Sequence, residues 1–305
     1  MKNRTVLKIN VSNLFTAEQM TSYSDLVAAY AKILADGQAL PMGGVTPLEK
    51  PLLAPDAPKA LIFSPHPDDE VIIGGLPLRL LREAKMNVIN VAVTQGSNKG
   101  RQAERWKELT ACCQHIGFGL IQTRAGGLEG MNPKFRETNP VAWTESVKRI
   151  AEILAEQKPR IIFFPHDHDW NSTHVGTHYV VADALAQLPS DFACYTVETE
   201  FWGAMDDPNL MVESSERDLA DLLTALSFHV GEVKRNPYHL RTPAWMIDSV
   251  RRGCELVGGQ GGAAPDFPFA TLYKLRRWSG EKFEPVLERG RFLPKSENAG
   301  RLFEA

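Results

Sequence analysis

A short apolar run that ends in a histidine and three carboxylates constrains this chain more than any other feature. Residues 60–63 predict a buried strand, and His66-Pro67-Asp68-Asp69-Glu70 follow before a predicted helical stretch over residues 71–84. His66 and Asp69 therefore fall on a tight turn from strand to helix. Their imidazole and carboxylate can face one cation, and this ligand mix suits zinc. Asp68 lies between them and is free for proton transfer.

The same carboxylates have a structural interpretation. Acidic residues at a helix start favour N-capping and the helix dipole, and Pro67 suits a first helical turn. A second polar strand end favours a metal-binding role over a capping role: residues 165–174 read Pro-His-Asp-His-Asp-Trp-Asn-Ser-Thr-His. Two such strand ends in an alternating chain are expected to meet at one edge of a sheet.

Strands and helices alternate along the middle of the chain. Further strands are predicted over residues 87–94, 160–165 and 192–200, and helices over residues 101–116, 139–157, 173–188 and 214–228. The glycine-containing stretch 121–139 is predicted to be irregular and to form a flap over the site. This alternation implies a Rossmann-like α/β fold, a mostly parallel sheet with helices on both faces.

Composition and charge limit the classes of protein. The 305 residues are 43% hydrophobic and carry a net charge of −3, which is ordinary for a globular protein and argues against nucleic acid as a partner. The four cysteines have no CxxC spacing, so neither a disulfide framework nor a cysteine zinc site is expected. Polar residues interrupt the N-terminal stretch, which predicts no membrane span and a cytoplasmic protein.

Three regions are predicted from the sequence. Residues 1–57 form a helical extension and linker, with a helix start at Thr16-Ala17-Glu18-Gln19, and residues 58–235 form the catalytic core. Residues 236–305 form a C-terminal extension packed on the core, with a helix over 243–257 and an edge strand over 267–275. Whether the N-terminal helix packs on its own chain or on another copy stays open, so a homo-oligomer is one alternative.

Four motifs in this order resemble those of the LmbE-like/PIG-L family of zinc-dependent de-N-acetylases, over roughly residues 58 to 230. They are Pro65-His66-Pro67-Asp68-Asp69-Glu70, Thr94-Gln95-Gly96, Arg105-x-x-Glu108 and Asp169-x-Asn171-x-x-His174. The resemblance implies a Rossmann-like fold and hydrolysis of an N-acetyl group on a small amino-sugar-like molecule, which yields acetate and a free amine.

The resemblance also implies roles for residues. His66, Asp69 and His174 would hold Zn²⁺, with another divalent metal as an alternative, and Asp68 would be the general base. Three protein ligands leave an open coordination position, as catalytic zinc requires. Arg105 would face substrate hydroxyls, and Trp202 would contribute to substrate binding.

The chain departs from the family pattern at two places. Asn171 stands where many members have a histidine beside the developing oxyanion, and we expect its amide to donate a hydrogen bond there. His178 is assigned a supporting role next to the substrate, although His174 and His178 could instead both bind metal. His229-Val230-Gly231-Glu232 replaces the family's His-x-Ser-Gln.

Three other functions remain open from the sequence. The site could cleave another amide in a non-sugar metabolite, or the fold could serve a binding protein without turnover. A dinucleotide-binding oxidoreductase is disfavoured, because the chain lacks a GxGxxG fingerprint.

Overall fold

The computed structural model describes residues 22–304, and the chain divides into two compact units, Met1–Leu40 and Pro41–Ala305. The first unit contains helix α1 (Tyr23–Gly37), where the Ser22 side chain accepts a hydrogen bond from the Asp25 N–H. No residue of α1 is buried, and its large apolar side chains, Leu26 among them, are exposed. The predicted helix start at residues 16–19 lies outside the described residues.

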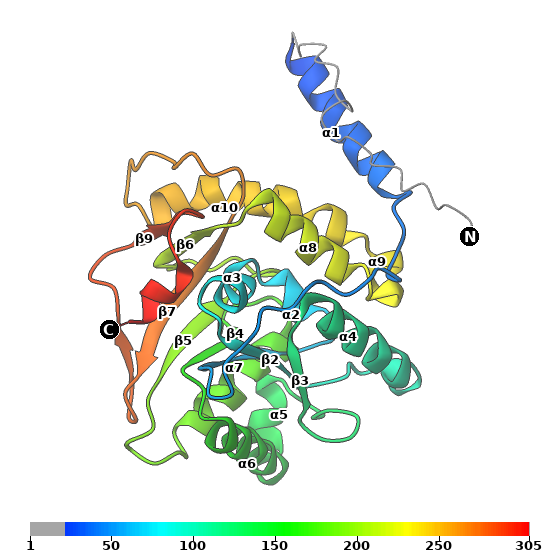
Figure 1. Ribbon diagram of the computed structural model, residues 1–305. Coiled ribbons are helices and arrows are strands. Elements are labelled where there is room, and N and C mark those ends of the chain that lie inside the picture. The colour runs from blue at the N-terminus through cyan, green and yellow to red at the C-terminus, as the bar shows by residue number, and fades with distance from the viewer. Residues whose placement is uncertain (1–21, 305) are drawn as a thin grey trace. The chain divides into compact units, whose positions relative to one another are not determined.

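The second unit is built on one sheet, whose strands within residues 22–304 follow the order β3-β2-β1-β4-β5-β7-β6-β9, with β8 paired to β7 (Figure 1). The first five strands in sequence are parallel: β1 (Lys59–Ser64), β2 (Asn87–Ala92), β3 (Gly119–Gln122), β4 (Ile161–Pro165) and β5 (Cys194–Thr199). The others are β6 (Leu210–Glu213), β7 (Ala270–Trp278), β8 (Phe283–Pro285) and β9 (Arg291–Leu293). The predicted Rossmann-like, mostly parallel α/β fold is confirmed.

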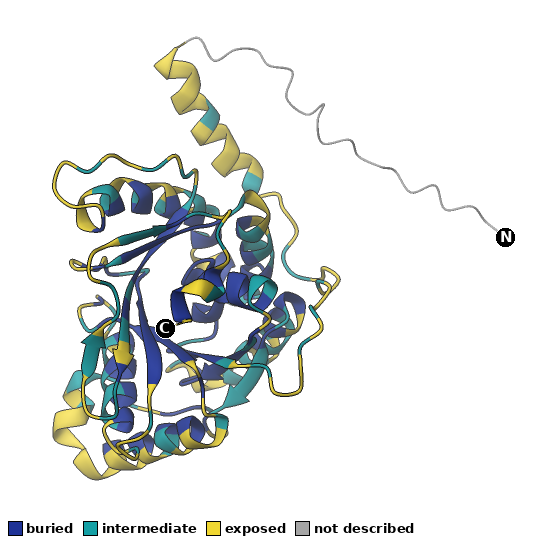
Figure 2. Ribbon diagram, turned by 60° about the vertical axis from the view of Figure 1, so that its left-hand side comes forward, coloured by how far each residue is buried: buried dark blue, intermediate teal, exposed yellow. Residues whose placement is uncertain are grey.

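Helices cover both faces of this sheet. Consecutive strand residues point to opposite faces, so Ala60 and Ile62 of β1 join one core and Leu61 and Phe63 the other. The first core is closed by α2 (Asp69–Ile72), α3 (Leu76–Glu83), α4 (Gln102–Ile116), α8 (Glu216–Leu226) and α9 (Val230–Arg235). The second is closed by α6 (Pro140–Gln157) and α7 (Ser172–Leu185). In Figure 2 the strands are mostly buried and the outer sides of these helices are exposed.

The predicted helix over residues 71–84 is broken into α2 and α3. Gly74 lies between them with φ +93°, and a Cβ there would come within 2.2 Å of Thr271 Oγ1. The chain can therefore pass close to β7 at this point only with a glycine. The stretch 121–139 also contains α5 (Pro133–Thr138), which the sequence did not predict.

The predicted edge strand over residues 267–275 is wrong in its position. It corresponds to β7, which lies between β5 and β6 and pairs antiparallel with both. The short strands β6 and β9 continue the sheet beyond β7, and short strands of this kind carry little pattern in a sequence.

Of the remaining C-terminal elements, α10 (Thr242–Leu256) packs on β7, whereas the two 3₁₀ turns, Tyr238–Leu240 and Ala299–Phe303, contact helices. A further 3₁₀ turn, Lys99–Arg101, precedes α4. The division at residues 58 and 235 stays a prediction, since segments on both sides of these points belong to the unit Pro41–Ala305. None of the helices between residues 22 and 304 is both long and apolar enough to cross a bilayer.

Candidate metal and catalytic site

The two polar strand ends meet because β1 and β4 are parallel neighbours in the sheet. The turn after β1 is held by the backbone N–H of His66, which donates to Asp69 Oδ2 at 2.7 Å. The turn after β4 is held by Asp169, whose Oδ1 accepts from the Asn171 N–H at 2.7 Å. Each carboxylate thus shapes its own loop as well as facing the site.

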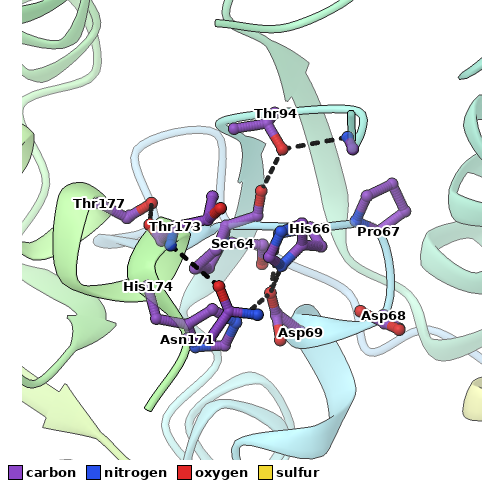
Figure 3. Close-up of polar contacts among 12 residues, drawn as sticks. Ser64, His66, Pro67, Asp68, Asp69, Thr94, Asn171, Thr173, His174 and Thr177 are labelled. Atoms are coloured by element: carbon purple, nitrogen blue, oxygen red, sulfur yellow. Dashed lines mark hydrogen bonds and ion pairs between the residues drawn. The ribbon is translucent and has the colours of Figure 1, made fainter. Parts of the chain in front are cut away.

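His66, Asp69 and His174 come together at this edge, as Figure 3 shows. Asp69 Oδ2 lies 3.4 Å from His66 Nδ1 and 3.3 Å from His174 Nε2. Zinc bonds of about 2.0 Å at tetrahedral angles place two ligand atoms about 3.3 Å apart. The spacing of these three side chains therefore fits a divalent metal.

His174 gives a second indication that a cation belongs here. Its Nε2 is buried and has no hydrogen-bond partner among the described residues. Its Nδ1 lies 3.4 Å from Asp169 Oδ2, so this carboxylate orients the ring from the other side. Burial disfavours the charged ring, but Asp69 and Asp169 outweigh burial and raise the pKa of His174 to about 10. Without metal, a proton takes the place of the cation.

A second cluster, Glu70, Cys112 and His229, also has ligand-type atoms close together. His229 Nε2 lies 2.6 Å from Glu70 Oε1, which is a hydrogen-bond distance and too short for two atoms bound to one metal. Burial and the nearby Glu70 raise the pKa of the Cys112 thiol well above its usual range, so it stays protonated. This cluster is a buried hydrogen-bonded group.

Asp68 lies beside the metal-type cluster with an unusual backbone, φ +121°. Its N–H donates to Glu70 Oε2 at 2.9 Å, and its Oδ2 accepts from the Tyr238 hydroxyl at 2.5 Å. Burial, together with the Asp69 carboxylate, raises the pKa of Asp68 to about 7. A carboxyl group with such a pKa is suited to take up and return a proton near neutral pH.

A cavity of about 500 Å³ opens beside these residues. Five of the residues predicted for the site line it: His66, Asp68, Arg105, Asn171 and Trp202. The predicted flap contributes residues 128–132 to the wall, and Lys99, Glu232 and Arg235 add charge. Asp69 and His174 are not part of this wall.

Asn171 caps α7, since its Oδ1 accepts from the Thr173 N–H at 2.9 Å. The cap assigns the carbonyl end of the amide to the helix, so the NH₂ end is the one left for the cavity. Arg105 donates from Nη2 to the Pro67 carbonyl at 3.0 Å, which fixes the turn that carries Asp68. Its guanidinium also lies 3.8 Å from Glu232.

His178 is placed apart from the cavity. Its Nδ1 lies 2.9 Å from the Pro165 carbonyl, and its ring packs against Phe164. It supports the end of β4 and does not join His174 in the metal-type cluster.

Sequence reasoning missed several residues of the site. Asp169 was named only as part of a motif, although its position predicts a role, because a carboxylate five residues before a metal-binding histidine can orient the histidine ring. The sequence also pointed to Glu232, because this carboxylate stands where the family has a glutamine. No sequence feature pointed to Tyr238, since this residue lies beyond the part of the chain that resembles the family.

Fold and site together define a Rossmann-like α/β protein with a candidate divalent-metal site at the carboxyl edge of its sheet. The model of the PIG-L family, described as GlcNAc-PI de-N-acetylase, matches residues 61–185. These residues therefore form a PIG-L (LmbE-like) family domain, and the resemblance seen in the sequence is confirmed.

A curated relative supports this assignment. The 1D-myo-inositol 2-acetamido-2-deoxy-alpha-D-glucopyranoside deacetylase of Mycobacterium leprae is 25% identical over 157 residues, which is 43% of this chain and 51% of the relative. The chain thus spans about half the length of the curated relatives it matches.

Solved structures share the fold. The N,N'-diacetylchitobiose deacetylase of Pyrococcus horikoshii has a TM-score of 0.51 at 17% identity, covering 86% of this chain and 95% of that chain. GalB, the 4-carboxy-2-hydroxymuconate hydratase of Pseudomonas putida KT2440, also has a TM-score of 0.51, at 14% identity, covering 72% of this chain and 95% of that chain. Proteins with this fold therefore include a hydratase as well as deacetylases.

Proposed function

We propose that this protein is a metal-dependent deacetylase that removes the N-acetyl group from a small amino-sugar-like substrate. One observation supports it above all: His66, Asp69 and His174 form a cluster beside Asp68, and His66 and Asp68 line a polar cavity. The PIG-L match over residues 61–185 agrees with this chemistry.

His66, Asp69 and His174 would hold the metal, and we propose zinc on the basis of two imidazoles and one carboxylate. When bound, the metal supplies Lewis-acid chemistry that polarises the amide carbonyl and makes water a better nucleophile. Asp69 and Asp169 keep the His174 ring in place.

Asp68 takes a proton from the attacking water, and the C–N bond of the amide then breaks. The protonated Asp68 returns this proton to the amine nitrogen as it leaves, so acetate and a free amine are formed. Asn171 donates an N–H to the carbonyl oxygen while negative charge develops on it. Both residues line the cavity, Asp68 after β1 and Asn171 after β4.

The cavity supports a small polar substrate. Its volume of about 500 Å³ is that of an ordinary small-molecule site. Trp202 offers an aromatic face to a sugar ring, and Arg105 offers N–H groups to hydroxyls beside its bond to Pro67. His178 acts on the substrate only through the end of β4.

The two alternative functions differ from the proposed one in whether acetate is released from an N-acetylated amino sugar. A metal-dependent amidase for a non-sugar metabolite would use the same residues on another amide, and a binding protein would show no turnover. Because the fold is shared with a hydratase, the fold alone does not choose among them.

The test is acetate release from a panel of N-acetylated amino sugars by the purified full chain. We expect turnover with about one metal ion per chain, loss on chelation and return with Zn²⁺. Asp68→Asn, which keeps all three metal ligands, is the matched inactive control. Active protein without metal would contradict the proposal, and so would release of acid only from non-sugar amides.

The cytoplasm remains our proposed compartment. All four cysteines are free, and three of them are buried, which suits a reducing environment. The proposed partner is the N-acetylated small molecule alone, with no nucleic acid or membrane. Light scattering of the purified protein tests whether several copies associate.

A further inference from the structure

We propose that Tyr238 is a positioning residue for the base Asp68, an inference that rests on the proposed function. Its hydroxyl holds Oδ2 of Asp68, so that Oδ1 is the oxygen that takes the proton. Tyr238 lies outside residues 61–185, the part of the chain that matches the family model. The positioning group thus comes from the C-terminal part of this chain.

The hydrogen bond between the two residues is short and buried. The Tyr238 hydroxyl donates to Asp68 Oδ2 at 2.5 Å, and the residues are 5% and 7% exposed. A buried tyrosine hydroxyl that donates to a carboxylate forms one of the stronger hydrogen bonds in proteins. Within residues 22–304, no hydrogen bond to Asp68 Oδ1 is found, and Asp68 lines the cavity.

Tyr238 is itself held rigidly. It begins the 3₁₀ turn Tyr238–Leu240, its carbonyl accepts from the Arg241 N–H at 2.8 Å, and its ring packs edge-on against Trp202. Phe201 adds a second aromatic contact. A donor whose backbone and ring are both fixed can fix the side chain that accepts from it.

The same C-terminal part also supports the backbone of Asp68. The N–H of Asp68 donates to Glu70 Oε2, and the other oxygen of Glu70, Oε1, lies 2.6 Å from His229 Nε2. A φ of +121° is costly for a residue other than glycine, and such strain persists where the surroundings impose it. Residues 229–238 are far from Asp68 in the sequence, yet they hold its side chain through Tyr238 and support its backbone through Glu70, in addition to the bond from Arg105 to Pro67.

The alternative role for Tyr238 is packing alone, in which the ring matters and the hydroxyl does not. Tyr238→Phe separates the two, because it keeps the ring and removes the donor. Tyr273→Phe is the matched control: Tyr273 is fully buried, and its hydroxyl donates to the Ile73 carbonyl at 2.8 Å, away from the cavity.

The experiment measures kcat, KM, metal content and Tm for both variants with an N-acetyl substrate that the wild-type protein hydrolyses. We expect Tyr238→Phe to lower kcat roughly 10- to 100-fold, with KM and metal content unchanged. Tyr273→Phe should lower Tm and leave kcat unchanged. Because Tyr238 acts through Asp68, adding Tyr238→Phe to Asp68→Asn should cause no further loss.

An unchanged kcat for Tyr238→Phe would overturn the inference while deacetylation stands, and so would a fall in kcat that persists in the Asp68→Asn background. Loss of metal or of folding in Tyr238→Phe would also overturn it, since the residue would then stabilise the fold. If the wild-type protein releases acetate from no substrate, the proposed function fails and this inference fails with it.

Discussion

Asp169 Oδ2 lies 3.4 Å from Nδ1 of His174, while Asp69 approaches Nε2 of the same ring at 3.3 Å. The imidazole is therefore held between two carboxylates, one on the metal side and one behind it. This arrangement fixes both the orientation of His174 and the nitrogen that faces the cation.

Asp169→Asn should weaken metal binding while the ligands themselves remain. The amide supports the ring without the negative charge, so we expect a loss of roughly 10- to 100-fold in affinity. Competition with a chromophoric chelator measures it. Asp167→Asn is the control, because Asp167 is a more exposed neighbour paired with His168, and it should bind metal as the wild type does. Equal affinities in all three proteins would contradict this role of Asp169.

Asp68→Asn and Asp69→Ala should separate base from ligand. Asp68→Asn removes the proton acceptor, so kcat should fall by roughly 10² to 10⁴ while metal content is kept. Asp69→Ala removes an oxygen that faces both histidines, so metal content itself should fall. Elemental analysis and kinetics of the two variants distinguish these roles. If Asp68→Asn lost the metal and Asp69→Ala kept it, Asp69 would be the base and Asp68 the ligand.

Asn171→Ala should lower turnover by about 10² to 10³ with metal retained, because it removes one donor to the developing oxyanion. It also removes the cap of α7, which costs about 1 kcal/mol of stability. Ser215→Ala removes the cap of α8 away from the cavity and controls for this effect. Similar kcat values in the two variants would leave Asn171 a helix cap only.

His174→Ala should lose the metal, whereas His178→Ala should keep it with most of its activity. His174 faces Asp69 at 3.3 Å, and His178 is engaged with the Pro165 carbonyl. Metal analysis of both variants tests this difference. A metal-free His178→Ala beside a metal-bound His174→Ala would require a different ligand set.

Metal binding should release about one proton and should strengthen as the pH rises. The pKa of His174 is raised to about 10 without metal, so its ring is protonated at neutral pH and the cation must displace that proton. Apparent affinity should therefore increase about tenfold per unit over roughly pH 6 to 8. Calorimetry in buffers of different ionisation enthalpy counts the proton, and a pH-independent affinity would show that the ring is already neutral.

The sequence by itself determined four of the five parallel strands, all but β3, and the residues at the edge of the sheet. The strand residues 60–63 and 161–165 are short apolar runs that are buried, and such runs can be recognised in a sequence without knowledge of their partners. His66, Asp69 and His174 directly follow strands or begin the next helix, so their meeting follows from parallel neighbours.

Only the tertiary structure decided which distant residues complete the site. Tyr238 reaches Asp68 across 170 positions of sequence, and Glu232 of α9 meets Arg101, in the turn before α4, across 131. The break at Gly74 and the inner position of β7 depend on each other in the same way, because β7 passes where a side chain at Gly74 would stand. Contacts of this kind arise when the layers pack together, and no local pattern of hydrophobicity or capping encodes them.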